Sequence, residues 1–290
     1  MRQLLPGVLF AALWASASAA TKFGVQSVDP LMLATVRFFI AGGLMLAYAY
    51  ALRHNNPLPK GVEWRQLTIF ALLNTTIYLG AYVIALKQVS AGIGSLSVAT
   101  NPLFITLMSA VWLRRPLRWF EGIGIALGLL GVSVATYPLL QDSHATVAGL
   151  LILLFGMISV SAATVYYARI NWRLPDVVIN GWQVLLGGIM LLPVTLLTAD
   201  FPAAHFDLRF WASVGWLIGP VSIVALQLWF YLIRLDAVRA SLWLFLCPIF
   251  GFGYSAVLLG EPMTLYTVAG TGLVIAGLYL AQREKFTSSK

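Results

Sequence analysis

The chain has 290 residues, of which 60% are hydrophobic and 10% charged, whereas soluble domains average about 45–50% and about 25%. No soluble fold could bury that much apolar surface, so the composition excludes a soluble protein. The net charge of +8 would suggest nucleic-acid binding in a soluble protein, but in so apolar a chain its distribution matters more, and no nucleic-acid partner is expected.

Ten apolar runs follow one another along the chain, each near the roughly 20 residues that a helix needs to cross about 30 Å of hydrocarbon. Long runs without alternation predict helices, because a helix satisfies its own backbone hydrogen bonds in lipid. The sequence therefore predicts an all-α integral membrane protein of ten transmembrane helices. The runs cover residues 4–23, 31–52, 66–86, 91–113, 120–140, 147–168, 177–198, 210–232, 240–259 and 264–281.

The first run also has the features of a secretory signal, because small residues follow an apolar stretch. The alternative is a first spanning helix. The internal repeat described below contains a counterpart of this run in mid-chain, where no signal peptide can lie. A spanning helix is therefore favoured.

Lysine and arginine are distributed unevenly between the two sides of this arrangement. If the N-terminus is cytoplasmic, all but four of the 18 Lys and Arg residues fall in cytoplasmic segments. Lys22, Lys87 and Arg209 fall outside, and Arg37 lies within the second run. Because cytoplasmic loops of membrane proteins are enriched in these residues, both termini are predicted to lie in the cytoplasm.

The sequence repeats itself at a shift of 143 to 146 residues. This repeat predicts two halves of five helices each, residues 4–140 and 147–282, followed by a cytoplasmic tail, 283–290. An odd number of helices per half inverts the second half in the membrane. The matches pair Ser18 with Ser161, Pro30 with Pro175, Ser95 with Ser241, Pro102 with Pro248, and Gly131 with Gly277.

These motifs, in their order and spacing, resemble the drug/metabolite transporter superfamily, in particular the EamA-type transporters with two EamA repeats. The resemblance implies ten helices around a central cavity, alternating access, and members that export amino acids and other metabolites. It implies no single substrate. Arg115 departs from the family pattern, in which an acidic residue often follows the fourth helix. The resemblance rests on Trp14, Ser16, Lys22, Pro30, Arg37, Pro102, Pro248, the Leu-Gly-Glu-Pro of 259–262 and the glycine-spaced fifth and tenth helices.

Polar and aromatic side chains within the runs are the candidates for a substrate cavity, because polar groups in lipid tend to face the bundle interior. Asn74, Tyr78 and Tyr82 recur every four residues and so share one helix face. The competing interpretations are helix packing and an interfacial aromatic belt. The candidates are Trp14, Asn74, Tyr78, Tyr82, Gln183, Gln227, Trp229 and Tyr231.

Arg37 needs solvation or a partner at its depth in the second run. It could attract a substrate carboxylate, or it could bond to helix-end carbonyls or to Asp29. Because the family resemblance places an arginine here whatever the substrate, a structural role is favoured.

Two prolines interrupt predicted helices at equivalent positions of the two halves, in Asn101-Pro102 and Cys247-Pro248. Proline removes a backbone hydrogen bond and crowds the preceding turn. Paired interruptions in inverted repeats indicate a midplane site or a hinge. A kink that only improves packing is the alternative.

The expected function is export of amino acids or similar small metabolites by alternating access in the inner (plasma) membrane, among membrane lipids. The alternatives are an uptake permease or lipid-linked carrier of the same fold, or a non-transport membrane receptor. No cofactor, metal site or enzyme activity is expected, because every histidine lies between runs and no phosphate-binding loop is present. No Asp or Glu lies in mid-run, which favours facilitated diffusion or exchange over obligatory proton coupling.

Overall fold

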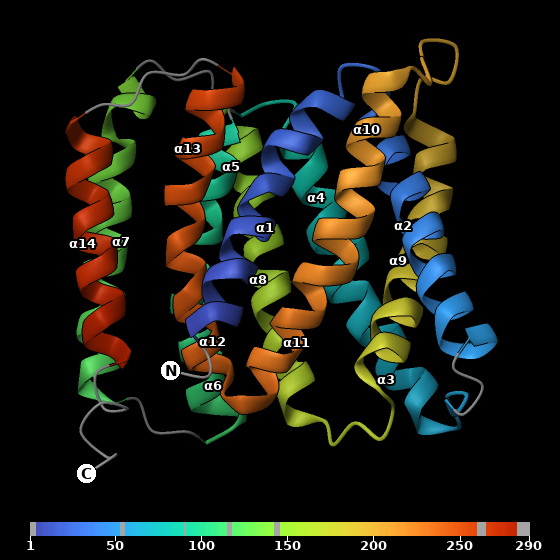
Figure 1. Ribbon diagram of the computed structural model, residues 1–290, viewed down its shortest axis with the longest axis horizontal. Coiled ribbons are helices and arrows are strands. Elements are labelled where there is room, and N and C mark those ends of the chain that lie inside the picture. Colours follow the sequence, from blue (N-terminus) through green and yellow to red (C-terminus); the bar gives the residue numbers. More distant parts are fainter. Residues whose placement is uncertain are drawn as a thin grey trace.

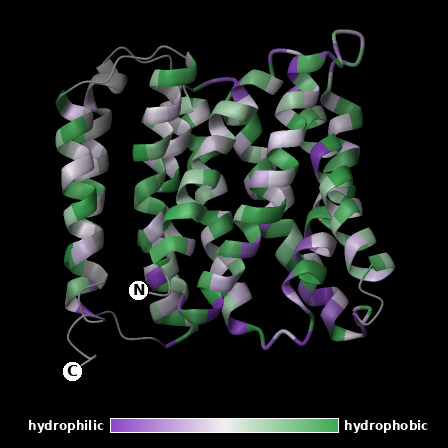
Figure 2. Ribbon diagram, in the orientation of Figure 1, coloured by the Kyte–Doolittle hydropathy of each residue, from purple (hydrophilic) through white to green (hydrophobic). Residues whose placement is uncertain are grey.

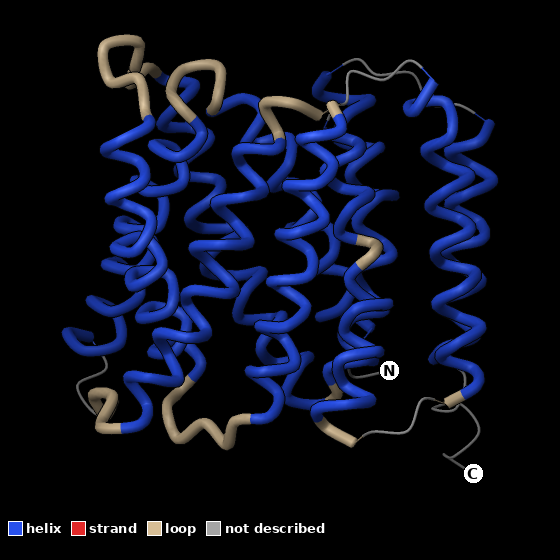
Figure 3. Tube along the Cα trace, turned by 180° about the vertical axis from the view of Figure 1, so that it is seen from behind, coloured by secondary structure: helices blue, strands red, loops and turns tan. Residues whose placement is uncertain are grey.

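A computed structural model of the chain describes residues 4–52, 56–89, 91–114, 118–141, 146–259 and 265–282. Over these residues the chain forms ten helical rods that stand side by side (Figure 1). The same described segments seen from behind contain helices and short connections and no strand (Figure 3). Arg115, Gly260 to Pro262 and the tail 283–290, which the sequence singled out, lie outside the described residues.

The first five rods come from the first half of the chain. The second and third rods change helical geometry along their length, because η1 and η2 are π-helical, and in the fourth rod two non-helical residues separate α5 from α6. The elements are α1 (Leu4–Gly24), α2 (Pro30–Ala47) with η1 (Tyr48–Leu52), α3 (Val62–Ala71) with η2 (Leu72–Ile77) and α4 (Tyr78–Ala85), α5 (Ala91–Val98) with α6 (Asn101–Trp112), and α7 (Trp119–Gln141).

The second half repeats this order, and its third and fourth rods are again irregular. Here η3 is π-helical and η4 is a 3₁₀ segment. The elements are α8 (Val147–Arg169), α9 (Asp176–Thr198), α10 (Leu208–Trp216) with η3 (Leu217–Ala225) and α11 (Leu226–Leu235), α12 (Ala237–Ser241) with η4 (Leu242–Leu246) and α13 (Cys247–Leu259), and α14 (Leu265–Gln282).

Seven of the described rods are long and apolar enough to cross a membrane. The described parts of the other three contain shorter apolar helices, Asn101–Trp112, Trp119–Gly131 and Val268–Gly277. Hydrophobic residues dominate along the rods, and hydrophilic residues gather at the two ends of the bundle (Figure 2). The chain is a multi-pass membrane protein.

Short polar side chains start several of these helices. The Asp29 carboxylate accepts a hydrogen bond from the backbone N–H of Leu31 (3.0 Å), and Pro30 follows it at the first helical position. The Asp207 carboxylate likewise accepts from the N–H of Phe210 (2.8 Å). Such caps satisfy N–H groups that have no partner within the helix. The N–H of Phe210 also lowers the pKa of Asp207, so this cap is present at neutral pH and is lost as the carboxylate is protonated in acid.

Glycines allow the closest helix pairs. A Cβ built on Gly131 of α7 would lie 2.5 Å from the carbonyl oxygen of Gly270 in α14, and one on Gly277 would lie 2.7 Å from that of Gly124. In the pair of α2 and α9, a Cβ on Gly42 would lie 2.9 Å from a backbone nitrogen. Small residues allow this backbone approach between membrane helices. The α7 and α14 pair stands at one edge of the bundle (Figure 1).

Two ion pairs occupy matching places in the two halves. Asp29 at the start of α2 pairs with Lys87 just beyond α4, 2.9 Å apart. Asp176 at the start of α9 pairs with Arg234 near the end of α11, 2.6 Å apart. Both residues of the second pair follow their counterparts by the same number of positions along the chain. We call the end of the bundle at which α1 begins and α14 ends the terminal end (Figure 1). The second pair lies there, and the first pair lies at the opposite end.

The irregular segments lie next to the two prolines that the sequence singled out. Asn101 and Pro102 open α6 directly after the break that follows α5, and Cys247 and Pro248 open α13 directly after the 3₁₀ turn of η4. The π-helical segments η2 and η3 were not predicted, and Pro220, which lacks a backbone N–H, lies within η3. The third and fourth rods of both halves therefore contain irregular backbone.

Candidate functional site

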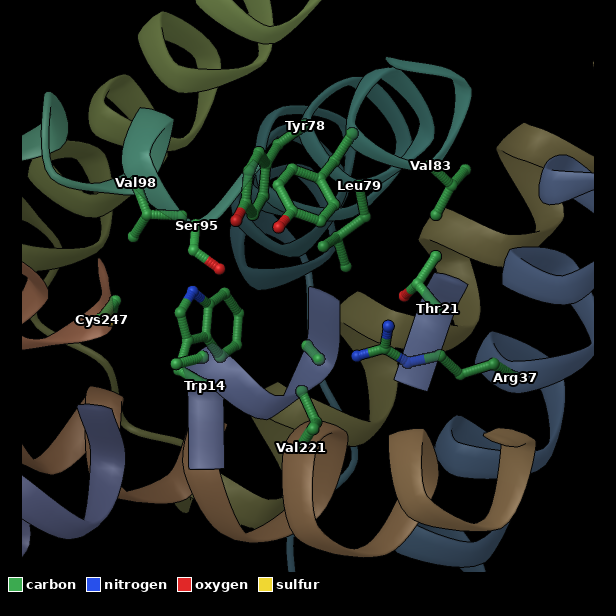
Figure 4. A pocket seen from close by; sticks show the side chains of 13 residues that line it. Trp14, Thr21, Arg37, Tyr78, Leu79, Val83, Ser95, Val98, Val221 and Cys247 are labelled. Atoms are coloured by element: carbon green, nitrogen blue, oxygen red, sulfur yellow. The ribbon is translucent and has the colours of Figure 1, made fainter. Parts of the chain in front are cut away.

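A small chamber lies between α1, α2, α4, α5, η3 and α13, elements that come from both halves of the chain (Figure 4). Its cavity volume is about 20 Å³, which is room for roughly one water molecule. We call it the central chamber. Its lining residues are Trp14, Ala15, Ala17, Thr21, Arg37, Tyr78, Leu79, Tyr82, Val83, Ser95, Val98, Val221 and Cys247.

Three aromatic side chains form one wall of the central chamber. The rings of Trp14 and Tyr78 stack with centroids 6.5 Å apart, and those of Tyr78 and Tyr82 lie 6.0 Å apart. Tyr78 begins α4 directly after η2, and the spacing of four residues places Tyr82 on the same face one turn later. Trp14 and the hydroxyl of Tyr78 are directed into the chamber (Figure 4). Large π faces and a hydroxyl donor thus meet at one place.

Arg37 enters the central chamber from α2. Its side chain is 3% exposed, its Nε donates a hydrogen bond to the Ser222 hydroxyl (2.9 Å), and its guanidinium carbon lies 5.6 Å from the centre of the Phe38 ring. Its Nη2 is buried without a hydrogen-bond partner. Asp29, the partner that the sequence suggested, is held instead by Lys87. The structure therefore places one unpaired guanidinium N–H group at the chamber.

A buried network of hydrogen bonds stands behind Arg37. The Asn180 amide donates to the backbone carbonyl of Ser222 (2.8 Å), and the Gln183 amide donates to the Asn180 side-chain oxygen (3.1 Å). The Gln183 oxygen accepts from Asn74 (3.2 Å) and from the Thr75 hydroxyl (2.5 Å). We call these five residues the amide network. It joins η2 of the first half to α9 and η3 of the second.

The remaining wall of the chamber is formed by α1, α5 and α13. The hydroxyls of Ser18 and Ser95 lie 2.8 Å apart and share a hydrogen bond, which connects α1 to α5. Cys247, the first residue of α13, is fully buried and is the single cysteine of the chain. Its thiol is 3.8 Å from the Ala11 carbonyl oxygen. The fourth and ninth rods thus reach the chamber through residues of α5 and α13.

Of the predicted cavity residues, the chamber lining includes Trp14, Tyr78 and Tyr82. Asn74 and Gln183 bond to each other in the amide network. The three candidates from α11 lie elsewhere. Gln227 has a buried amide nitrogen without a hydrogen-bond partner, Trp229 stacks on Phe10 with centroids 4.8 Å apart, and Tyr231 is 43% exposed.

The candidates at the helix interruptions divide between two places. Cys247 lines the central chamber, and Pro248 follows it in α13. Asn101 is buried and its side-chain oxygen accepts a hydrogen bond from Ser161 of α8 (3.2 Å). Pro102 is buried beside it in α6. This pair therefore lies at the contact between the fourth and sixth rods.

Sequence reasoning missed Ser222, which holds Arg37 through its hydroxyl and Asn180 through its carbonyl. A signal was present in Pro220, two residues earlier. A proline in mid-run interrupts regular helical geometry, and it marks the irregular segment η3 in which Ser222 lies. The position of Ser95 was noted only as a repeat match, and its contact with Ser18 is a product of packing.

A second hollow, which we call the lateral groove, lies between α1, α10 and α13. Its cavity volume is about 840 Å³, and its walls are almost entirely apolar. Phe23, Trp216, Phe250 and Tyr254 line it, and Arg209 lies at the start of α10. Such walls fit hydrocarbon better than a polar solute.

Apolar helical rods around an aromatic and guanidinium-lined chamber, which draws on both halves, form the architecture of a membrane transporter. The chain matches the EamA-like transporter family twice, over residues 2–137 and 147–282. Together the two matches cover most of the chain. The protein therefore belongs to the EamA-like transporter family, within the drug/metabolite transporter superfamily, and is a membrane transporter rather than an enzyme.

Several relatives resemble the chain over nearly its whole length. An uncharacterized transporter of Archaeoglobus fulgidus is 26% identical over 98% of this chain and 100% of its own. The uncharacterized inner membrane transporter YedA of Escherichia coli K12 is 30% identical over 98% of this chain and 93% of its own. A crystal structure with 20% sequence identity shares the fold, with a TM-score of 0.80 over 100% of this chain and 99% of that one.

Proposed function

We propose that this protein exports amino acids or similar small metabolites by alternating access around the central chamber. The observation that carries the proposal is the position of the chamber, where helices of both halves that adjoin irregular segments meet a buried arginine and three aromatic rings. Transporters of related design bind their substrates between repeats, at interrupted helices. The amino-acid cargo and the direction of transport rest on the family resemblance.

The proposed architecture for this mechanism is ten transmembrane helices in two inverted halves, residues 4–140 and 147–282. The first helix of each half packs on the third and fourth rods of the other half. The helix α1 contacts the eighth and ninth rods, and α8 contacts the third and fourth. The ion pairs Asp29–Lys87 and Asp176–Arg234 occupy equivalent positions at opposite ends of the bundle. Such a two-fold relation allows the two halves to exchange roles as access alternates.

The terminal end of the bundle is proposed to face the cytoplasm, together with the tail 283–290. Described cations gather there, including Arg65, Arg169, Arg173 and Arg234, whereas Lys87 and Arg209 lie toward the other end. This asymmetry follows the positive-inside rule. The Escherichia coli relative is named an inner membrane transporter, and we propose the same membrane for this chain.

The conformation described here is contracted around the chamber. Space for roughly one water is far below the roughly 300 Å³ or more of ordinary ligand sites. Substrate entry therefore requires the surrounding rods to separate. The third, fourth, eighth and ninth rods are interrupted by irregular helical segments close to the chamber. Asn101-Pro102 and Cys247-Pro248 are the proposed hinge positions.

Facilitated diffusion or exchange is the proposed mode of energy coupling. Among the described residues, none of those that line the chamber is an aspartate or glutamate, and proton-coupled carriers often use a buried carboxylate. In proteoliposomes, an imposed pH gradient should leave substrate at equal concentrations on both sides. Uphill accumulation driven by that gradient would contradict this mode.

The transport proposal is tested by efflux of a preloaded amino-acid mixture from proteoliposomes. The protein should release at least one amino acid faster than protein-free liposomes do. Tyr78→Ala should slow that release or change its selectivity, because it removes a ring from the chamber wall. Tyr231→Ala is the matched control, because Tyr231 is 43% exposed. Equal efflux with and without protein, for every solute class, would favour a non-transport role.

A carrier of lipid-linked substrates is the second candidate, and the lateral groove is the observation that favours it. Its apolar walls and Arg209 suit an acyl chain and an anionic headgroup. Reconstituted protein should then move a fluorescent anionic lipid between leaflets, and Gly253→Leu, placed in the groove wall, should block that movement. A lipid distribution equal to that of protein-free vesicles would remove this candidate.

A further inference from the structure

We propose that Arg37 is the anion-binding half of the substrate site, so that transported molecules carry a carboxylate group. The inference rests on the proposed transport function, defines the substrate class of the same chamber, and gives Arg37 the carboxylate-binding role in place of the structural role that the sequence favoured. Neutral or cationic analogues that lack the carboxylate should be poor ligands.

The first support is the depth and burial of the guanidinium. Arg37 follows Pro30, the first residue of α2, by seven positions, which places it about 10 Å along the helix from that end. Its side chain is 97% buried, since only 3% is exposed. Charged groups are costly within the membrane and tend to mark substrate paths or to pair with other groups. A partner for the charge is therefore required.

The second support is that the protein supplies only part of that partner. Ser222 accepts one hydrogen bond from Nε, and Nη2 has none. Arg37 forms no ion pair with a carboxylate among the described residues, and the nearby Asp29 is paired with Lys87. Removal of a buried charge partner is strongly destabilising, so an arginine left without one suggests that its anion arrives with the substrate.

The third support is the direction of the side chain. In the close-up view the guanidinium extends from α2 toward the middle of the chamber, past Thr21 and opposite Trp14 (Figure 4). Ser222 is itself held by Asn180 through its carbonyl (2.8 Å), so the Arg37 head is anchored on one side and open on the other. A planar guanidinium presents several N–H donors in a fixed fork and suits the two oxygens of a carboxylate.

The rest of the chamber fits the remainder of such a molecule. Trp14, Tyr78 and Tyr82 offer aromatic faces to an apolar side chain, and their rings and hydroxyls can also face an amine. No carboxylate among the described lining residues offers a matching charge for a cation. Recognition by charge therefore falls on the anionic group, and a positively charged amine without a carboxylate would carry no negative group to offset the repulsion of Arg37.

The test measures thermal stability of the full-length protein in detergent with L-amino acids and with their carboxamides, at equal ionic strength. The probes are leucine, phenylalanine, glutamine and serine, each beside its amide, with sodium acetate as the simplest carboxylate. A ligand that binds the folded protein raises its melting temperature. The acids should stabilise the protein with apparent affinities about tenfold or more above those of the amides, because hydrogen bonds to a charged group are lost in the amide.

Three variants separate binding from folding. Arg37→Gln should remove the preference for acids, and Arg37→Lys should retain part of it, because the charge stays but the fork is lost. Arg209→Gln is the matched control, because Arg209 lies beside the lateral groove and donates to Gln26 (2.7 Å) rather than facing the chamber. It should keep the full preference. Gel filtration of each variant in detergent reports whether it folds.

Each outcome decides the inference independently of the transport proposal. Equal stabilisation by acids and amides, no stabilisation by any probe, or an unchanged acid preference in folded Arg37→Gln would overturn it. If Arg37→Gln does not fold, folded Arg37→Lys decides: a weakened acid preference supports the inference, and an unchanged one overturns it. If acids bind through Arg37 but no solute leaves proteoliposomes, the transport proposal fails and the anion site stands.

Discussion

Gly131→Ala and Gly277→Ala are each expected to destabilise the protein, whereas Gly272→Ala on the same helix as Gly277 is expected to leave it unchanged or slightly more stable. The added methyl groups of the first two variants would lie 2.5 Å and 2.7 Å from backbone carbonyl oxygens of the facing helix. Backbone atoms cannot move aside as a flexible side chain can, so α7 and α14 must separate.

The expected loss is about 1–3 kcal/mol, the usual cost of overpacking. A Cβ on Gly272 meets nothing within 4 Å, and alanine favours a helix over glycine by about 1 kcal/mol. The same glycine-to-alanine change is thus expected to lower the stability of the protein at Gly277 and to leave it unchanged or raise it at Gly272. Thermal unfolding in detergent, followed by gel filtration, measures both. Equal shifts at Gly277 and Gly272 would show that the close approach of the pair does not depend on glycine.

Gln183→Leu is expected to destabilise the protein strongly, whereas Gln227→Leu is expected to be neutral or stabilising. Gln183 is fully buried and makes three hydrogen bonds, with Asn74, Thr75 and Asn180. Leucine has a similar size but cannot replace any of them. Gln227 instead has a buried amide nitrogen that lacks a partner, so leucine there removes an unsatisfied polar group.

The expected cost at Gln183 is about 2–5 kcal/mol, if three bonds contribute about 0.6–1.7 kcal/mol each, as between other membrane helices. Urea or thermal unfolding of both variants in the same detergent gives the comparison. Efflux assays add a second readout. If Gln227 contacts substrate in another conformation, its leucine variant should keep stability and lose transport. A Gln183→Leu variant as stable as the parent protein would show that the amide network does not hold η2 to α9.

The arrangement of rods was largely readable from the sequence, because the length of an apolar run reports the thickness of the bilayer. The sequence repeat pairs Gly131 with Gly277, and each of these glycines closely approaches a backbone carbonyl oxygen of the facing helix. The repeat could not show that α7 and α14 pack against each other. Partner choice depends on shape along the whole helix, which no local pattern contains.

The chamber was only partly readable. Helical spacing placed Asn74, Tyr78 and Tyr82 on one face, and two of them line the chamber. Asn74 instead meets Gln183, 109 residues further along the chain. A polar residue in a membrane helix must face either a cavity or another polar group, and the sequence does not tell which. For the same reason the sequence did not identify Ser222 as the hydrogen-bond partner of Arg37. Asp29, the partner that it suggested, pairs with Lys87 at the end of the bundle.

Alternating access through the central chamber is tested most directly by labelling Cys247, the chain's single cysteine, which is fully buried in the chamber wall. A small membrane-impermeant thiol reagent is applied from one side and then from the other of oriented proteoliposomes, with Cys247→Ala as the unlabelled control. The mechanism requires that Cys247 react slowly from both sides, that a bound amino acid protect it, and that a gradient of that amino acid shift the balance between the sides. Reaction from one side only under every condition, or no protection by any transported solute, would contradict it.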